Sequence, residues 1–223
     1  MFLSPRTKRS ATKRSLSHYY RIEFMIEVEK KFILTEKEKE RLIKGAEFLN
    51  EKMFTDIYYD TNDFLLTSND RWLRSRDGKF ELKIPIHQGA DRLIDQYNEL
   101  EDEQKIREAL NLFSQRSISD DLARKEYYSF CTCKTTRRKY KKGLFIIDLD
   151  IVDFNHFTYT IGEIELMVNE KSEIKTAIGK IMSFAKEHNL NIAPARGKVI
   201  EYLKRMRADH YHSLIRAGVV KDY

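Results

Sequence analysis

The stretch Ile26-Glu27-Val28-Glu29-Lys30-Lys31-Phe32 decides how the rest of the chain is interpreted. Successive side chains of a β-strand point to opposite faces of the sheet, so residues two apart share a face. A strand here places Glu27, Glu29 and Lys31 on one face and Val28 on the other. Two carboxylates beside an ammonium make poor core material, but such a face can hold a divalent cation next to an anion. We therefore expect the charged face to point into a binding site and Val28 to point away from it.

The same alternation recurs in four later stretches, where charged residues two apart are flanked by apolar ones. These pairs are Arg74/Arg76, Glu81/Lys83, Asp148/Asp150 and Glu163/Glu165. An open antiparallel sheet with one solvated face explains any single pair. Five such strands favour a sheet closed on itself with the charged face inward, because like charges repel unless a counter-ion lies among them. Clustered carboxylates bind hard cations such as Mg²⁺, and clustered arginines bind phosphate through paired hydrogen bonds.

The composition limits the class of protein. A length of 223 residues fits one large domain, and the charged fraction of 34% exceeds the roughly 25% of ordinary globular chains. The net charge of +6 arises within residues 1–22, which hold six bases and no acid, so that the remaining chain has 35 bases and 35 acids. A formally neutral body argues against a nucleic-acid partner. No run of about 18 apolar residues is present, so no transmembrane helix is expected.

Two features bear on the compartment. Residues 1–21 are rich in Ser, Thr and basic residues, which is typical of a disordered tail and also of a mitochondrial targeting segment. Both interpretations stay open, the targeting segment as the minority one. Cys131 and Cys133 would face the same way on a strand with poor geometry for a disulfide, which indicates free structural thiols in a reducing compartment such as the cytoplasm.

The order of elements predicts a single α+β domain over residues 22–223, dominated by antiparallel hairpins. Turn signals such as Asp77-Gly78, and the capping box at Thr35-Glu36-Lys37-Glu38, separate the elements. The expected strands span residues 24–33, 54–60, 72–76, 80–86, 96–100, 130–138, 144–153 and 159–168. The expected helices span residues 35–49, 101–128 (as two helices broken near 117–119), 172–189 and 198–217.

Taken together, these motifs resemble the CYTH superfamily, the triphosphate tunnel metalloenzymes, over about residues 24–215. The resemblance rests on the Glu-x-Glu-x-Lys signature at residues 27–31 and on motifs that follow it in the family's order. They are Tyr58-Tyr59-Asp60-Thr61, Trp72-Leu73-Arg74-Ser75-Arg76, Glu81-Leu82-Lys83, Tyr97-Asn98-Glu99-Leu100, Asp148-Leu149-Asp150, Gly162-Glu163-Ile164-Glu165 and Lys198-Val199-Ile200-Glu201-Tyr202-Leu203. The resemblance implies an eight-stranded antiparallel β-barrel, or tunnel, with a charged lumen and helices packed outside. It further implies hydrolysis of a terminal phosphate with a divalent metal ion. Mg²⁺ is the expected ion, and Mn²⁺ stays open as the alternative.

The resemblance also implies roles for individual residues. The residues that match the metal-binding set are Glu27, Glu29, Asp148, Asp150, Glu163 and Glu165. The residues that match the substrate-binding set are Lys31, Trp72, Arg74, Arg76, Lys83, Glu99, Arg137 and Lys198. Arg137 is chosen from the run Thr135–Lys139 because this choice keeps Tyr140 where the family has an aromatic residue. Lys83 or Tyr58 is expected to orient the attacking water as a catalytic residue, and the sequence does not choose between them.

Three functions remain open at this stage. The motif Trp72-Leu73-Arg74-Ser75-Arg76, because of its tryptophan, resembles the corresponding motif of the animal thiamine triphosphatases within the family. This resemblance implies hydrolysis of thiamine triphosphate to thiamine diphosphate and phosphate. Trp72 either stacks on the thiazolium ring or packs at the end of the barrel. Inorganic tripolyphosphate is an alternative substrate, since charge complementarity alone accepts it. A non-catalytic phosphate-binding module is the third interpretation. In each case we expect a monomer that binds a small triphosphate, without a membrane or nucleic-acid partner.

Overall fold

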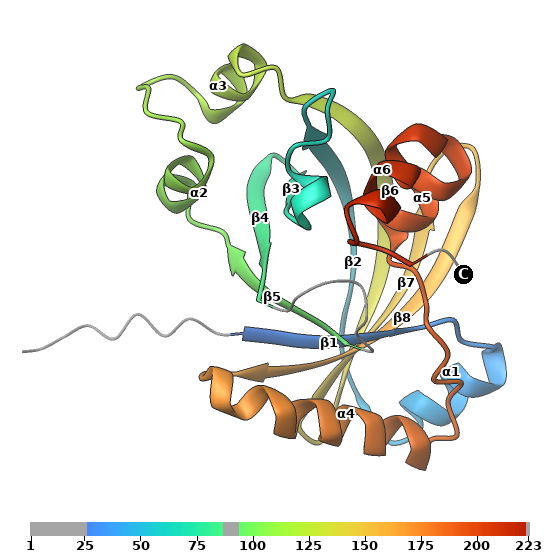
Figure 1. The fold of residues 1–223 in the computed structure, drawn as a ribbon. Coiled ribbons are helices and arrows are strands. Elements are labelled where there is room, and N and C mark those ends of the chain that lie inside the picture. The colour runs from blue at the N-terminus through green and yellow to red at the C-terminus, as the bar shows by residue number, and fades with distance from the viewer. Residues whose placement is uncertain (1–25, 87–93, 222–223) are drawn as a thin grey trace, which may run out of the picture.

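The computed structural model describes residues 26–86 and 94–221. Its strands form a closed antiparallel barrel in the order β1-β5-β4-β3-β2-β6-β7-β8 (Figure 1). The eight strands are β1 (Ile26–Phe32), β2 (Glu47–Asp60), β3 (Trp72–Arg76), β4 (Lys79–Pro85), β5 (Asp95–Leu100), β6 (Tyr128–Lys142), β7 (Phe145–Asp153) and β8 (Thr158–Val168). The predicted fold class, an eight-stranded antiparallel barrel, is therefore confirmed.

The helices lie in the loops between strands and after β8. They are α1 (Glu36–Ile43), α2 (Glu103–Leu110), α3 (Ile118–Arg124), α4 (Ile174–Glu187), α5 (Lys198–Met206) and α6 (Ala208–Arg216), with short 3₁₀ turns η1 (Thr67–Asn69) and η2 (Lys171–Glu173). Among the described residues, no helix is long and apolar enough to cross a membrane.

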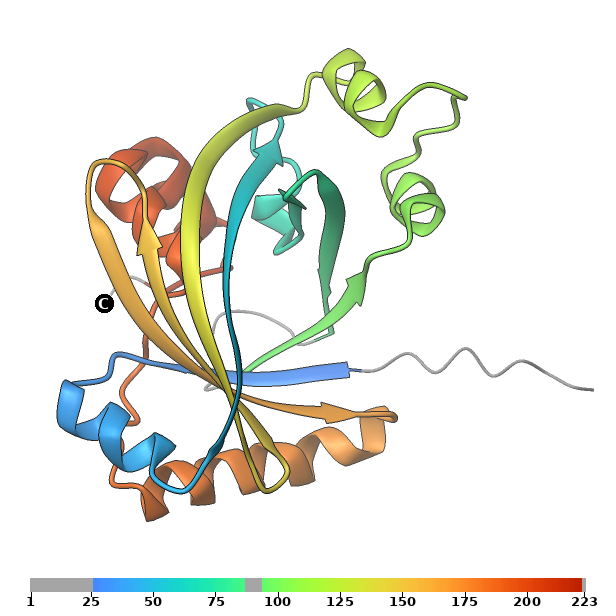
Figure 2. The same cartoon turned by 180° about the vertical axis from the view of Figure 1, so that it is seen from behind.

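The apolar face of the barrel points outward and is covered by helices. Val28 on β1 and Ile164 on β8 are fully buried and belong to one cluster with Ile181 and Ala185 of α4. Figure 2 shows α4 and α1 together on one side of the barrel, with α5 and α6 on the other. On β3, β4 and β5, a second cluster joins Leu82 to residues of α2 and α3. The hydrophobic core therefore lies outside the barrel wall, and the inner face is free to carry charge.

Helices α5 and α6 pack differently, because they contact the inner face of the barrel. Val152 follows Asp148 and Asp150 at two-residue spacing on β7, so all three point inward. Val152 is fully buried in a cluster with Tyr58, and with Leu203 of α5 and Leu214 of α6. The C-terminal helices thus close one end of the barrel with apolar side chains, and only the rest of the lumen is charged.

The predicted helix at 35–49 is too long. Its capping box is present, with Thr35 accepting from the Glu38 backbone, but α1 ends at Ile43. Gly45 has a φ of +74°, a left-handed conformation that ends a helix, and β2 begins at Glu47. Of the apolar residues that suggested a longer helix, Ala46 precedes β2 and Leu49 lies on this strand, where its side chain is exposed. The strand expected at 54–60 has 14 residues, because it pairs along its length with the 15-residue β6.

The predicted C-terminal helix at 198–217 is two helices. Arg207, with φ of −140° and ψ of 65°, is not helical and separates α5 from α6. This bend allows Leu203 and Leu214 to reach the same cluster inside the barrel. The first of the two helices expected within 101–128 ends at Leu110 and not near residue 117, because Asn111 adopts a left-handed conformation with φ of 56°. The other element boundaries differ from the expected ones by four residues or fewer, and the predicted N-terminal tail lies outside the described residues.

The buried contact of α4 with β1 and β8 predicts a large loss of stability for Ile181→Ala. Removing this fully buried side chain is expected to lower the free energy of unfolding by about 2–5 kcal/mol, through lost burial and the remaining cavity. Urea unfolding followed by circular dichroism measures the change. Lys180→Ala, at an exposed neighbouring position of the same helix, is the control and is expected to have little effect. Equal stability of the two variants would contradict this placement of the core.

His210 on α6 predicts that stability falls in mild acid. The ring is buried, stacks on Phe64 and bonds Thr67 Oγ1 through Nε2 at 2.7 Å. Burial, followed by the charge of Arg207, lowers the pKa of His210 to about 4. The unfolded chain binds this proton below about pH 6.5, so the stabilisation is present above that pH and is lost as the pH falls toward 4.

Urea unfolding at pH 7 and at pH 5 tests this prediction. The wild type is expected to lose about 2 kcal/mol more stability over this interval than His210→Gln, which removes the titrating ring. Identical losses in the two proteins would assign the acid sensitivity to other groups.

Candidate active site

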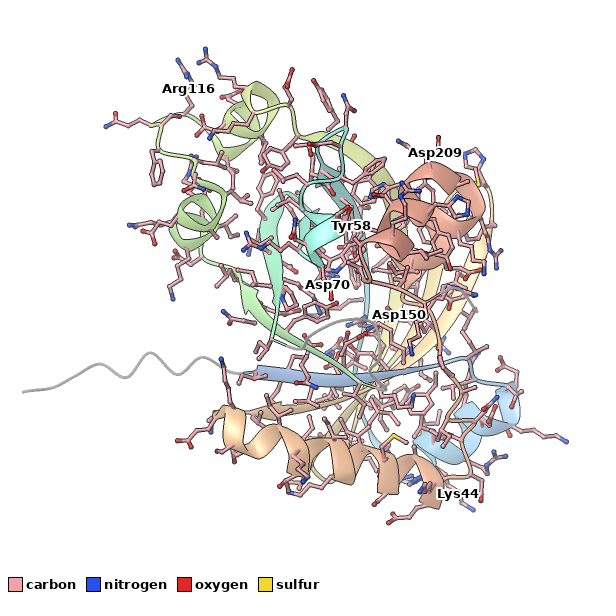
Figure 3. All side chains as sticks on the ribbon, in the orientation of Figure 1. Lys44, Tyr58, Asp70, Arg116, Asp150 and Asp209 are labelled. Carbon is pink, nitrogen blue, oxygen red and sulfur yellow. The ribbon has the colours of Figure 1, made fainter. Side chains whose placement is uncertain are left out.

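A cavity of about 390 Å³ occupies the charged part of the barrel. Its walls come from the strands other than β7, from Asp70 before β3, and from residues 194–200 and 219–221 at the two ends of the α5–α6 pair. Figure 3 shows Tyr58, Asp70 and Asp150 near the centre of the molecule, whereas Lys44, Arg116 and Asp209 lie at the periphery. Glu27, Glu29 and Lys31 line the cavity while Val28 is buried outside it, as the alternation in β1 predicts.

The carboxylates gather in two groups that share Glu165. Oxygens of Glu27, Glu29 and Glu165 lie within 4.8 Å of one another, as do those of Asp148, Glu163 and Glu165. The strand register explains the grouping. Glu29 is the cross-strand neighbour of Glu165, and Asp148 is the neighbour of Glu163. Residues far apart in the sequence thereby meet at one level of the lumen.

These groups fit a divalent cation. Burial, with the nearby Asp148 carboxylate, raises the pKa of Glu165 to about 8. Burial also raises the pKa values of Glu27 and Glu163, although Lys83 and Arg137 oppose the effect. Asp148 Oδ1 is fully buried and has no hydrogen-bond partner within the described part of the chain. A cation bound by these oxygens would relieve the repulsion and satisfy the unpaired atom.

Arg137 is the main counter-ion of the second carboxylate group. Its guanidinium donates two hydrogen bonds of 2.7 Å to Asp150, bonds Glu163 at 3.0 Å and also contacts Asp148. Asp150 belongs to neither carboxylate group of the described residues. Its two oxygens face Arg137, so the geometry makes Asp150 the partner of a base and gives it less freedom as a metal ligand.

Three bases form a second zone around Asp56, a residue that the sequence analysis did not select. Asp56 is fully buried and accepts from Arg76 at 2.8 and 3.1 Å and from Lys198 at 2.6 Å. Arg74 lies on the same face of β3, two residues before Arg76. Burial opposes ionisation of Asp56, but Lys198 and the arginines outweigh it and hold its pKa well below the usual range.

An aromatic ring supports the same zone. The Phe54 ring lies 4.0 Å from the guanidinium carbon of Arg76 and 5.3 Å from Nζ of Lys198. Positive groups over an aromatic face gain a cation–π attraction and lose freedom of movement. Phe54 and Asp56 therefore hold the basic heads in position before any anion arrives.

Lys83 and Lys31 lie among the carboxylates of the cavity. Lys83 Nζ is 3.1 Å from Glu27 and 2.5 Å from Glu99, so Glu99 is a lumenal residue as expected. Burial opposes the charge on Lys83, but Glu27, Glu29 and Glu99 outweigh it and raise its pKa well above its ordinary value. Lys31 bonds Glu29 and, at 2.7 Å, Asp95. Both lysines remain ammonium ions.

Tyr58 and Trp72 lie at different parts of the cavity wall. Tyr58 is buried and packs beside Phe130 in the apolar cluster that closes the barrel. Burial raises the pKa of Tyr58, so its phenol stays neutral. Trp72 is half-buried, and its indole Nε1 donates to Asp70 at 2.8 Å. Both residues line the cavity.

Several lumenal residues were missed by the sequence analysis. Lys139 also points inward, where its Nζ lies 3.0 Å from Asp148 and 3.6 Å from Glu165. Its two-residue spacing from Arg137 was the available signal. Asp56 could have been found in the same way, because it shares parity with Tyr58 on β2. Asp70 has no such signal, since it ends a 3₁₀ turn and not a strand.

Comparison with known proteins agrees with this geometry. The CYTH domain matches residues 25–192. The chain belongs to the CYTH family. It is 32% identical over 218 residues to the thiamine-triphosphatase of Homo sapiens and 31% identical to that of Macaca fascicularis. Each alignment covers 89% of this chain and 93% of the relative.

Solved structures show the same fold at lower identity. A Pyrococcus horikoshii protein superposes with a TM-score of 0.59 and 23% identity, over 80% of this chain and 99% of the other. A Hippeastrum adenylyl cyclase candidate, which reveals a dominant triphosphatase activity, gives a TM-score of 0.50 and 18% identity, over 79% of this chain and 94% of the other. At these identities the likeness supports the fold alone.

The contacts of Arg137 predict that Arg137→Met is unstable without a divalent cation. Removing the guanidinium leaves buried carboxylates without a counter-charge, which is expected to cost about 3–5 kcal/mol in the free energy of unfolding. Millimolar Mg²⁺ is expected to restore part of that loss, because the ion supplies the missing charge. Thermal unfolding in EDTA and in Mg²⁺ measures both effects.

Arg138→Met is the matched control. Arg138 follows directly on β6, but its side chain is 60% exposed and pairs only with Glu51 in the described part of the chain. Its loss is expected to change little, with no dependence on Mg²⁺. If Arg137→Met unfolds at the same temperature as Arg138→Met, the ion pairs of Arg137 with the lumenal carboxylates do not contribute to stability.

Proposed function

We propose that this chain hydrolyses the terminal phosphate of a small triphosphate with the help of Mg²⁺, and that thiamine triphosphate is its substrate. The observation that carries the proposal is the division of the barrel interior into a carboxylate zone, where Lys31 and Lys83 pair with Glu29 and Glu27, and a basic zone around Asp56. Family membership and the two thiamine-triphosphatase relatives support a triphosphatase, and the relatives favour this substrate. Mn²⁺ is the alternative ion, since oxygen ligands suit both.

The carboxylates would hold the cation. Glu27, Glu29 and Glu165 form one candidate set, and Asp148 with Glu163 and Glu165 forms the other. Asp150, included among the ligands from the sequence, acts in this proposal as the partner that orients Arg137. A bound divalent ion supplies neutralisation of phosphate charge and a lowered pKa for a bound water.

The basic zone would bind the polyphosphate. Arginine presents two parallel N–H donors to phosphate oxygens. Arg74 and Arg76 would therefore bind the polyphosphate through paired hydrogen bonds, and Lys198 would add a compact positive charge. Charge moves onto the transferring and leaving groups during phosphoryl transfer, and donors already in place stabilise it without reorganisation. Asp56 and Phe54 provide that preorganisation by fixing Arg76 and Lys198. Lys31 and Arg137 complete the basic set beside the carboxylates.

Lys83 is the better candidate to orient the attacking water. Its ammonium lies among lumenal carboxylates, whereas Tyr58 packs into the closed apolar end. A protonated lysine can donate to the water oxygen but cannot accept its proton. In this scheme Lys83 is a positioning donor held by Glu27 and Glu99.

The substrate beyond the phosphates would contact Trp72. Its indole lines the cavity two residues before Arg74 on the same face of β3. A substrate whose triphosphate is bound by Arg74 can therefore bring its organic ring into contact with Trp72. Stacking on a thiazolium cation contributes about 0.5–2 kcal/mol. Tripolyphosphate is the second candidate, because the basic zone needs no ring to bind a triphosphate.

A phosphate-release assay tests the proposal. Thiamine triphosphate, tripolyphosphate and ATP are compared in Mg²⁺ and in EDTA, and release is expected with Mg²⁺ and fastest from thiamine triphosphate. Glu29→Gln and Lys198→Met are each expected to lower kcat/KM by about a hundredfold or more, because each loses a charge that the transition state needs. Lys180→Met, exposed on α4, is the control for a lost lysine. No release from any of the three would exclude the enzymatic function and leave a phosphate-binding module.

A further inference from the structure

Asp70 joins two aromatic side chains at the cavity wall. One oxygen of its carboxylate, Oδ1, accepts from Trp72 Nε1 and from the Tyr97 hydroxyl, each at 2.8 Å. Trp72 lies on β3 and Tyr97 on β5, so Asp70 connects strands that are separated by β4. All three residues line the cavity. Asp70 itself is 8% exposed and adopts a left-handed conformation, with φ of 55°, that turns the chain from η1 into β3.

We propose that Asp70 is a specificity-determining residue that selects an organic cation as the non-phosphate part of the substrate. This inference rests on the proposed function and adds to it a charge requirement at a named residue. The carboxylate has two consequences at once. It anchors the indole N–H of Trp72 and the hydroxyl of Tyr97, and it places a negative charge at the edges of both rings.

The charge makes this part of the cavity suit a cation. The face of an aromatic ring attracts positive charge, and Trp is the strongest of the aromatic residues in this respect. A hydrogen bond from the indole N–H to a carboxylate polarises the ring further toward negative potential, because hydrogen-bonded groups polarise one another in a low-dielectric site. A planar cation such as a thiazolium ring would meet the face of Trp72 and the charge of Asp70, whereas the Tyr97 ring already has Lys83 Nζ 5.6 Å from its centre.

The same charge disfavours phosphate at this position. An anionic polyphosphate would be repelled by Asp70 and attracted by Arg74, which lies two residues from Trp72 and therefore about 7 Å farther along β3. The substrate would thus bind in one orientation, with its cationic ring at Asp70 and its phosphates at the basic zone. A neutral base or a bare polyphosphate gains nothing from Asp70.

The test uses Asp70→Asn, which keeps an acceptor oxygen for both donors and removes the charge. The ratio of kcat/KM for thiamine triphosphate to kcat/KM for tripolyphosphate is expected to fall about tenfold or more. Asp209→Asn removes the same charge from an exposed position on α6 and is expected to leave the ratio unchanged. An equal loss on both substrates would show that Asp70 is only structural, while the proposed function would stand.

A binding measurement separates failure of this inference from failure of the proposed function. Trp72 is the only tryptophan of the chain, so its fluorescence reports on this site alone. Unphosphorylated thiamine is expected to quench it with saturation, and Asp70→Asn is expected to weaken the apparent affinity about tenfold. Quenching that is equal in the wild type and the variant would overturn the inference, whether or not any substrate is hydrolysed.

Tyr97→Phe is a second variant that keeps the inference testable if Asp70→Asn does not fold. It keeps the ring and the Asp70 charge and removes one donor, so a smaller fall of the same ratio is expected. If Tyr97→Phe changes the ratio as much as Asp70→Asn does, hydrogen bonding and not charge determines the selectivity, and the inference fails.

Discussion

The structure depends on how a closed sheet can keep ionised groups inside. A carboxylate or ammonium taken out of water is costly unless another charge or a hydrogen-bond partner compensates it. Here each cationic head in the lumen touches at least one carboxylate, as Arg76 and Lys198 do at Asp56 and Arg137 does at Asp150. The apolar clusters that stabilise the domain are built on the outer face and at one end, where α4 and the α5–α6 pair cover the sheet. The apolar packing of the helices therefore offsets the energetic cost of burying charges inside the barrel.

The pairing is uneven, and the unevenness divides the cavity. In the basic zone Arg76 and Lys198 share Asp56 while Arg74 pairs with Glu81, so three bases face two acids and the positive charge is in excess. Around Glu165 the carboxylates outnumber the nearby bases, and burial raises the pKa of this residue to about 8. An excess of each sign within one cavity is the arrangement that a complex of a metal ion with a polyphosphate would complete. A rigid set of paired ions also has little to reorganise when such a complex binds.

The sequence predicts the barrel well because its signal is periodic. Alternation in Ile26–Phe32 placed Glu27 inward and Val28 outward, and the same parity applied to β3, β7 and β8 identifies most of the lumenal charges. Parity does not give register, however. Which carboxylate faces which base follows from the cross-strand pairing, so the attachment of Asp150 to Arg137 could not be read from spacing. Asp70 escaped for another reason, since it reaches the cavity from a turn that has no periodicity. The boundary of α1 was missed because an apolar stripe continued beyond Gly45 into a strand.

The apolar seal formed by α5 and α6 makes the barrel a blind chamber and not a passage. Tyr58, Val152 and Leu203 fill one end, so a substrate that enters must leave, as products, by the way it came. A chamber that is closed at one end limits the length of the part of a molecule that can fit inside it. Within the described residues, a polyphosphate that reaches Arg74, Arg76 and Lys198 would find no passage past the packed side chains of α5 and α6. The fold therefore limits how far a phosphate chain can enter the barrel.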